Sequence, residues 1–157
     1  MPEAVEEKQE EKQEEKQKRE FISFYLGQKC YAIDVLALSD IIQPLPVAYL
    51  PNSPSFVSGI INLRGNIIPV VNFTMFFGIS CNNNADGKKV KTIIIEKQGE
   101  KIGLFIDEVL GILSLSASKI DPPVLAVENK TLNYVEGISN VAGRTIYILN
   151  VEEFFKK

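Results

Sequence analysis

Apolar residues in the main part of the chain form short runs that are rich in Ile, Val, Phe and Tyr. Turn residues separate these runs at short intervals, as at Pro51-Asn52 and Gln98-Gly99. Short β-branched and aromatic runs bounded by Gly, Pro and Asn are typical of the strands of small all-β proteins. The pattern predicts strands at 21–27, 30–36, 90–97 and 101–110.

Two segments have a helical pattern instead. Residues 73–78 end in a glycine and residues 151–157 end in two lysines, and both features favour a helix C-terminus. The sequence therefore predicts an all-β fold with short helices.

The chain also contains an internal repeat. The stretch 56–77 aligns with 134–155 at an offset of 78 without a gap, and nine of the 22 positions are identical. Upstream, 31–42 aligns more loosely with 102–113 at an offset of 71. A repeat of this kind means that one supersecondary unit is used twice. We expect each copy, about 65 residues long, to form its own compact β-barrel, with further apolar area buried where the two barrels meet.

The two copies differ at one position that stands out. Shared glycines allow turns or close backbone approach, and Asn62 and Asn140 are expected to serve the same turn through side-chain hydrogen bonds. Arg64, however, stands in the apolar run GIINLRGNIIPVVN and is aligned with Ala142. Because an unpaired buried arginine is costly, Arg64 either lies at a turn tip facing a partner or meets a carboxylate. The difference favours a special role for Arg64; a structural salt bridge unique to the first copy is the alternative.

The first 20 residues have a different character. The sequence EEKQ occurs three times in 6–17, which places like charges at i and i+4, where they repel. We expect 1–20 to be a charged, disordered tail and 21–157 to be the folded part. Of the 20 acidic and 17 basic side chains, 8 and 5 lie in the tail, so the folded part is neutral. It lacks the basic footprint of a nucleic-acid-binding protein.

Composition also argues against metals, cofactors and membrane insertion. The chain has no histidine, and its two cysteines lack CxxC spacing, so we expect no metal site and no cofactor. It has no run of 18 apolar residues, and its N-terminal tract lacks the apolar segment of a signal peptide. We expect a cytoplasmic protein with reduced thiols and no direct membrane insertion.

No catalytic motif is present. The sequence lacks a histidine base and the glycine patterns of hydrolases, P-loops and dinucleotide sites. Asp107 and Glu108 are neighbours on an expected strand and would point to opposite faces. Cys30 has only Lys29 as a basic neighbour and is expected to be buried, while Cys81 is expected to be exposed. We expect a non-enzyme that works by surface recognition.

Several long motifs point to a known family. They are FxxFxLGxxxYxIDVxxLxDII at 21–42, GxxNLRGxxxPVxN at 59–72 and GLFIDEVLGILSLSASKIDPP at 103–123. On these motifs the chain resembles the CheW-like domain family of bacterial chemotaxis coupling proteins over almost all of 21–157. No kinase ATP site, phosphoacceptor domain or receiver domain accompanies the motifs. A free-standing adaptor is therefore the best match within the family.

The resemblance implies a fold and a function. The fold is two intertwined, five-stranded SH3-like β-barrels related by internal duplication. The function is that of a non-catalytic scaffold that couples membrane chemoreceptors to the histidine kinase CheA in chemotaxis signal transduction. The implied partners are the cytoplasmic tips of chemoreceptors and the CheW-like domain of the kinase, at membrane receptor arrays.

The resemblance also implies two binding surfaces. The receptor-facing residues are Leu38, Asp40, Gly59, Asn62, Arg64, Val109, Ile112 and Gly137. The kinase-facing residues are Ile41 and Asp121. Asp40 takes the place of a glutamate that is usual in the family, and we expect it to pair with Arg64 at the rim of the receptor groove.

Two other functions stay open from the sequence. The chain could be a CheW-like adaptor of a kinase system outside chemotaxis, which the sequence does not separate from a chemotaxis adaptor. It could also be a barrel protein that senses a small ligand or a redox change, for which thiol reactivity at Cys30 would be a test.

Overall fold

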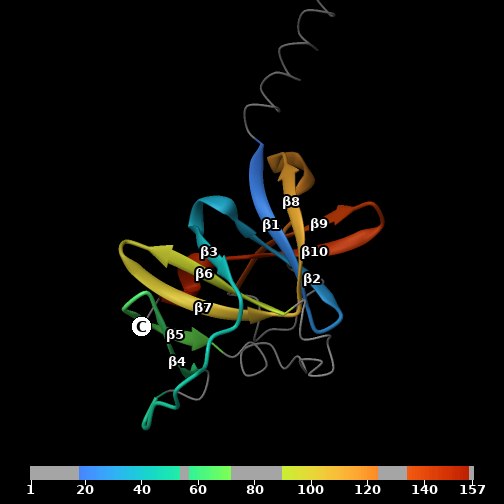
Figure 1. Cartoon of the computed structure of the whole chain (residues 1–157). Helices are drawn as coiled ribbons and strands as arrows, with labels where there is room; N and C mark the ends of the chain where they lie inside the picture. Colours follow the sequence, from blue (N-terminus) through green and yellow to red (C-terminus); the bar gives the residue numbers. More distant parts are fainter. Residues whose placement is uncertain (1–17, 54–56, 72–89, 124–133, 156–157) are drawn as a thin grey trace, which may run out of the picture.

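The structure is a computed structural model that describes residues 18–53, 57–71, 90–123 and 134–155 (Figure 1). These residues form ten strands in two five-stranded SH3-like sheets, so the predicted all-β fold with two five-stranded units is confirmed. The terminal sheet has the order β8-β1-β2-β10-β9 and the central sheet the order β3-β6-β7-β5-β4.

The bounds of the elements follow. The terminal sheet consists of β1 (Arg19–Leu26), β2 (Lys29–Asp34), β8 (Glu108–Leu115), β9 (Val135–Val141) and β10 (Arg144–Leu149). The central sheet consists of β3 (Leu38–Ile42), β4 (Val57–Leu63), β5 (Asn66–Val71), β6 (Lys91–Lys97) and β7 (Glu100–Ile106). The short helices are η1 (Val35–Ala37), η2 (Ala117–Lys119) and α3 (Val151–Phe155).

The two copies of the repeat exchange strands. Replacing each of β1–β5 by the strand five places later, and the reverse, converts the strand order of the terminal sheet into that of the central sheet. Even the one parallel pair of each sheet corresponds, β2 with β10 and β7 with β5. The expectation that each copy forms its own barrel is wrong, because each sheet combines strands from both copies.

The exchange happens where the chain passes from one sheet to the other. In the second copy this occurs at Asp107, so the single strand predicted for 101–110 is two strands in different sheets. The Asp107 amide donates to the Tyr25 carbonyl at 2.9 Å, and its carboxylate accepts from the Gly27 amide at 2.8 Å. These bonds hold the break against the β1–β2 turn. In the first copy, η1 separates β2 from β3 in the same way, so the strand predicted for 30–36 ends at Asp34.

The predicted tail boundary and the two predicted helices have different outcomes. Strand β1 begins at Arg19, inside the tail predicted for 1–20, because Arg19 pairs with Leu115 of β8 and forms ion pairs. The helix predicted for 151–157 is confirmed over 151–155 as α3, and 156–157 lie outside the described residues. The helix predicted for 73–78 lies outside the described residues.

Apolar side chains pack into three clusters. The largest is a shared core between the sheets, with Phe24 and Ile33 from the terminal sheet and Ile93 and Ile95 from the central sheet. Each sheet also has a cluster on its other face, and Ile94 belongs to that of the central sheet. The run of three isoleucines in β6 is therefore buried on both faces of its strand, which explains why it is apolar throughout instead of alternating.

Each sheet is closed across its edges at a glycine. The segment after β3 returns to β4 on the opposite edge, where Ala48 and Ile60 exchange hydrogen bonds of 2.8 and 2.9 Å. The segment after β8 returns to β9, where Asp121 and Ile138 exchange bonds of 2.7 and 2.8 Å. Ile60 and Ile138 are the same position of the repeat, and a glycine precedes each.

Candidate binding surface

Four apolar residues predicted for the two binding surfaces occupy matching places in the two copies. Leu38 and Ile41 lie on β3, and Val109 and Ile112 lie on β8. Each pair is three residues apart, a spacing that would turn the two side chains to opposite faces of a regular strand. A register shift in each strand, with the extra residue at Ser39 or Leu110, prevents this.

The register shows which way the four side chains point. Leu38 pairs with Ile95 and Ile41 with Ile93, both members of the shared core. Val109 pairs with Phe24 and Ile112 with Ile22, which also belong to that core. The two bulges therefore bring all four side chains to the side of the molecule where the sheets meet.

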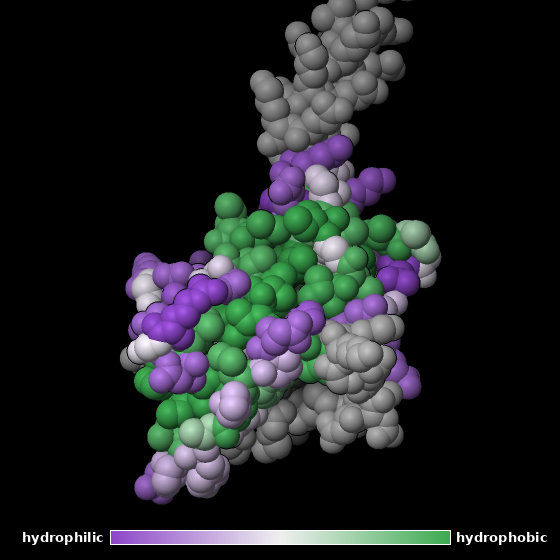
Figure 2. All heavy atoms as spheres, viewed as in Figure 1, coloured by the Kyte–Doolittle hydropathy of each residue, from purple (hydrophilic) through white to green (hydrophobic). Residues whose placement is uncertain are grey.

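This side has an apolar surface, which Figure 2 shows over η1, β3, β1 and β8. Leu36 on η1 is 95% exposed, and Ile112 is 64% exposed, while Leu38, Ile41 and Val109 are partly buried against the shared core. We call these five residues the apolar strip. Large apolar side chains left in solvent beside a packed core are typical of a protein interface.

The ion pair predicted between Asp40 and Arg64 is confirmed. Arg64 Nη1 lies 3.5 Å from Asp40 Oδ2, which joins the turn between β4 and β5 to the opposite edge strand β3. Arg64 is at the turn tip with φ of 52°, and its side chain is 77% exposed. Arg64 thus lies at a turn tip and also meets a carboxylate, in an exposed pair, and a partner facing this tip stays a prediction. A pair this exposed contributes only about 0–1 kcal/mol to stability.

Three other residues predicted to face the receptor have structural roles in the fold. Asn62 accepts a hydrogen bond from the Gly65 amide at 3.0 Å, so its predicted role in the turn is confirmed. Gly59 and Gly137 are buried under the two closing bridges. A Cβ at Gly59 would lie 2.4 Å from the Ala48 carbonyl oxygen, and one at Gly137 would lie 2.4 Å from a methyl carbon of Ile120. Neither glycine contributes a side chain to the surface, and a direct contact with a receptor stays a prediction for both.

The two predicted kinase-facing residues do not lie together. Ile41 packs against the shared core beside Leu38, on the same side as the predicted receptor residues. Asp121 belongs to the closing bridge of the terminal sheet and pairs with Ile138. The two residues therefore belong to different sheets. Ile41 lies on the same surface as the predicted receptor-facing residues, so the structure does not divide this surface into a receptor part and a kinase part.

Other kinds of site have little support within the described residues. No group of three or more potential metal ligands gathers there. None of the helices in this part of the chain has the length and apolar character that a membrane span requires. Cys30 is buried, as predicted. Burial raises the pKa of its thiol, and the nearby charge of Arg144 offsets part of the rise. Cys81 lies outside the described residues.

Sequence reasoning missed the exposure of Leu36 on this surface and the place of Arg19 in a strand. Leu36 was assigned to a strand, although Asp34 two residues before it is a typical cap for a tight turn. Arg19 was assigned to the tail because it lies within a charged tract that runs to Glu20. Its position two residues before the buried Phe21, on the same face of a strand, was the only available signal.

Comparisons with known proteins agree with this architecture. The family model of the CheW-like domain matches residues 20–157. The chain belongs to the CheW-like domain family. Chemotaxis protein CheW of Helicobacter pylori is 32% identical over 139 residues, which cover 88% of this chain and 82% of that protein. Chemotaxis protein CheW of Thermotoga maritima is also 32% identical over 139 residues, covering 88% of each chain.

A solved structure extends the CheW likeness to three dimensions. The scaffolding protein TtCheW from Thermoanaerobacter tengcongensis superposes with a TM-score of 0.77 at 30% identity, covering 88% of each chain. The resemblance read from the motifs is thereby confirmed. The chain is a member of a family of CheW chemotaxis scaffold proteins.

Proposed function

We propose that the protein is a non-catalytic adaptor that couples membrane chemoreceptors to a CheA-type histidine kinase. The observation that carries this proposal is the apolar strip, in which matching positions of two sheets form one surface in a CheW-like chain. Two-sheet construction gives the surface a length that one small sheet would lack. In this proposal the protein is recruited from the cytoplasm to receptor arrays.

The receptor side of the proposal rests on the chemistry of the strip. A helical receptor tip that binds in a groove needs apolar anchors at intervals of three to four residues. Leu38 and Ile112, on different sheets, supply exposed or partly exposed apolar atoms for such anchors. Asp40 and Arg64 form a charged pair on the central sheet, which we place at the rim of the groove. Weak individual contacts of this kind become strong in an array through multivalency.

The kinase side rests on the fold. A kinase that carries a CheW-like domain would present a similar two-sheet body, so that adaptor and kinase could pack through related surfaces. Ile41 and Asp121 remain the residues proposed for this contact. Their placement on different sheets predicts two kinase contacts instead of one.

The test is a reconstituted coupling assay. Purified protein is mixed with a CheA-type kinase and receptor cytoplasmic fragments, and kinase autophosphorylation is measured with and without it. We expect receptor-dependent kinase activity only when the protein is present. The variant Ile112→Asp should lose the coupling, whereas Tyr49→Asp, which places the same charge at another strongly exposed apolar residue, should retain it.

Other results have distinct meanings. Kinase binding without any effect of receptor fragments would favour an adaptor of a kinase system outside chemotaxis. Absence of binding to both partners would reject the proposed coupling role.

A further inference from the structure

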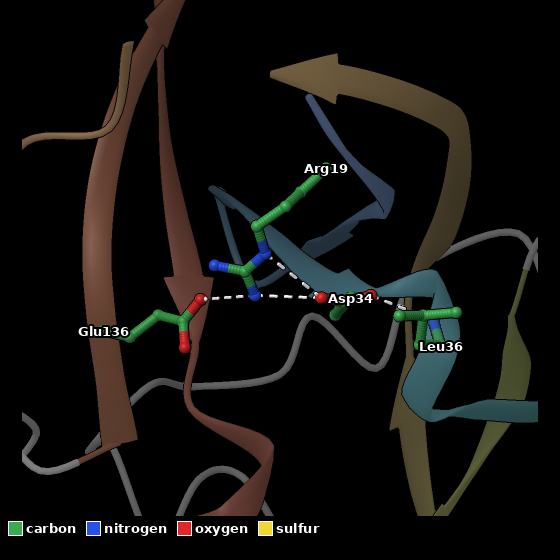
Figure 3. Close-up of polar contacts among 4 residues, drawn as sticks. All are labelled: Arg19, Asp34, Leu36 and Glu136. Carbon is green, nitrogen blue, oxygen red and sulfur yellow. Dashed lines mark hydrogen bonds and ion pairs between the residues drawn. The ribbon is translucent and has the colours of Figure 1, made fainter. Parts of the chain in front are cut away.

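Arg19, on β1, contacts side chains of β2 and β9 in the terminal sheet, close to the start of η1 (Figure 3). Its Nε and Nη2 atoms lie 3.2 and 2.9 Å from Oδ2 of Asp34, at the end of β2. The same Nη2 lies 3.0 Å from Oε1 of Glu136, on β9. The guanidinium also lies over the ring of Phe21, with 4.9 Å between its central carbon and the ring centroid. Arg19 is therefore held from three directions.

Asp34 connects Arg19 to η1. Its second carboxylate oxygen, Oδ1, accepts a hydrogen bond of 2.9 Å from the Leu36 amide and so caps the helix. One carboxylate thus joins the Arg19 guanidinium to the backbone of the turn that carries Leu36. A three-residue 3₁₀ turn with no buried residue has little stability of its own.

The charges of the cluster favour a fixed geometry. Arg19 stands between two carboxylates, and the exposed fraction of the side chain is 44% for Arg19, 23% for Asp34 and 31% for Glu136. Burial alone would lower the pKa of Arg19, but the hydrogen bond to Asp34 and the charge of Glu136 outweigh it and raise the pKa.

We propose that Arg19 is a positioning residue for partner binding, which acts through Asp34 to hold η1 so that Leu36 is presented as an anchor of the apolar strip. This inference rests on the proposed function, since it assumes that the strip receives a partner. A fixed loop binds more tightly because it loses less conformational freedom on binding. Arg19 itself need not touch the partner.

The first test measures the positioning directly, without any partner. Amide hydrogen exchange at Leu36 is compared in the wild type, in Arg19→Gln and in Lys97→Gln. Lys97→Gln is the matched control, because it removes a different ion pair, Lys97 with Glu152 at 3.6 Å. We expect roughly tenfold faster exchange at Leu36 in Arg19→Gln and no change in the control. Equal exchange in all three proteins would overturn the inference.

The second test is a double-mutant cycle with receptor cytoplasmic fragment as the probe. Arg19→Gln should weaken binding roughly threefold to tenfold in the wild-type background, because one anchor loop must then be ordered on binding. In the Leu36→Ala background the same change should have almost no further effect. An equal loss in both backgrounds would mean that Arg19 contacts the partner or acts through the whole fold, and the inference would be wrong.

The two tests separate this inference from the proposed function. If the wild type fails to bind receptor fragments, the proposed function fails, and the exchange at Leu36 still decides whether Arg19 positions the turn. If the wild type binds and Arg19→Gln binds equally well, the positioning role fails while the proposed function stands. Thermal melts of all variants identify any that are simply unfolded.

Discussion

The two sheets are closed in the same way by their backbones but differ in the side-chain contacts at the closure. Each is closed by a returning segment that pairs with an edge strand beside a buried glycine, at Gly59 or Gly137. Each also turns at a residue with φ of 52°, Arg64 in the central sheet and Ala142 in the terminal sheet. The central sheet adds an ion pair across its edges there, from Arg64 to Asp40, whereas the terminal sheet adds a hydrogen bond at its closure, from the Ser139 hydroxyl to the Lys119 carbonyl at 2.9 Å. The closing bridges, the glycines and the turn conformation occur in both sheets and are needed for folding. The Arg64–Asp40 pair occurs in the central sheet alone among the described residues and can serve another function.

The largest effect is expected when the closing glycines are changed. Gly59→Ala should reduce the free energy of unfolding by about 3 kcal/mol or more, because φ is +155° and the new Cβ would meet a backbone oxygen. Gly137→Ala should cost about 1–3 kcal/mol, because the new Cβ would meet the Cγ2 methyl of Ile120 but the backbone at Gly137 adds no strain from a positive φ. Urea unfolding followed by circular dichroism measures both. Equal losses would show that the two closures tolerate crowding alike.

The apolar strip should separate binding from stability. Val109→Asp places a carboxylate against the shared core, so it should lower stability and receptor binding together. Ile112→Asp, on the same strand but 64% exposed, should leave the melting temperature nearly unchanged and weaken receptor binding at least about tenfold. Titration with receptor fragments and a thermal melt of each variant test this. Full binding by Ile112→Asp would remove β8 from the proposed groove.

A smaller effect on stability is expected at the turn position that distinguishes the sheets. Arg64→Ala should change the free energy of unfolding by less than about 1 kcal/mol, since the pair is exposed and Ala142 already occupies the matching turn with the same φ. Receptor-dependent kinase activation should fall nonetheless. Ala142→Arg is the control for adding an arginine at the other turn. A large loss of stability in Arg64→Ala would instead support a structural salt bridge.

The smallest effect concerns the Cys30 thiol. Burial raises its pKa above the ordinary 9.0, so the protonated thiol is favoured by folding, and the stability this gives below the unfolded pKa is lost as the pH rises through the folded pKa. In a Cys81→Ser background, a thiol reagent should react slowly with the folded protein at neutral pH and rapidly in urea. Arg144→Gln should slow the reaction further, since Arg144 lowers the pKa. Rapid reaction of the folded protein would favour the redox-sensing alternative.

The sequence predicted much of the fold and one contact of the site. Runs rich in isoleucine and valine identified most strands, and the repeat predicted two related units. Arg64 was identified because the repeat provided an internal comparison, in which Ala142 marks what the turn itself requires. That comparison, together with the family resemblance, led to its pairing with Asp40.

The residue pattern alone could not predict the exchange of strands, for a physical reason, and intertwined barrels were implied only by the family resemblance. Alternation of apolar residues shows which face of a strand is buried but not which strand lies beside it, so β7 and β8 read as one strand through Asp107. The bulge at Leu110 is followed by Gly111 with φ of 138°, and a glycine inside a strand is a recognised sign of a bulge. The bulge at Ser39 has no such neighbour, and only the pairing partner reveals it. Arg19 was missed because local composition describes a charged tract, whereas its partners at 34 and 136 are distant in sequence.

The exchange of strands makes the two halves of the chain mutually dependent. The N-terminal half holds β1–β5 and the C-terminal half β6–β10, and neither contains all the strands of any sheet. Two such halves produced as separate polypeptides would each be left with open sheet edges and would fold only on meeting. The same architecture would arise if two copies of an ancestral single unit had once traded strands as a dimer and later been joined into one gene.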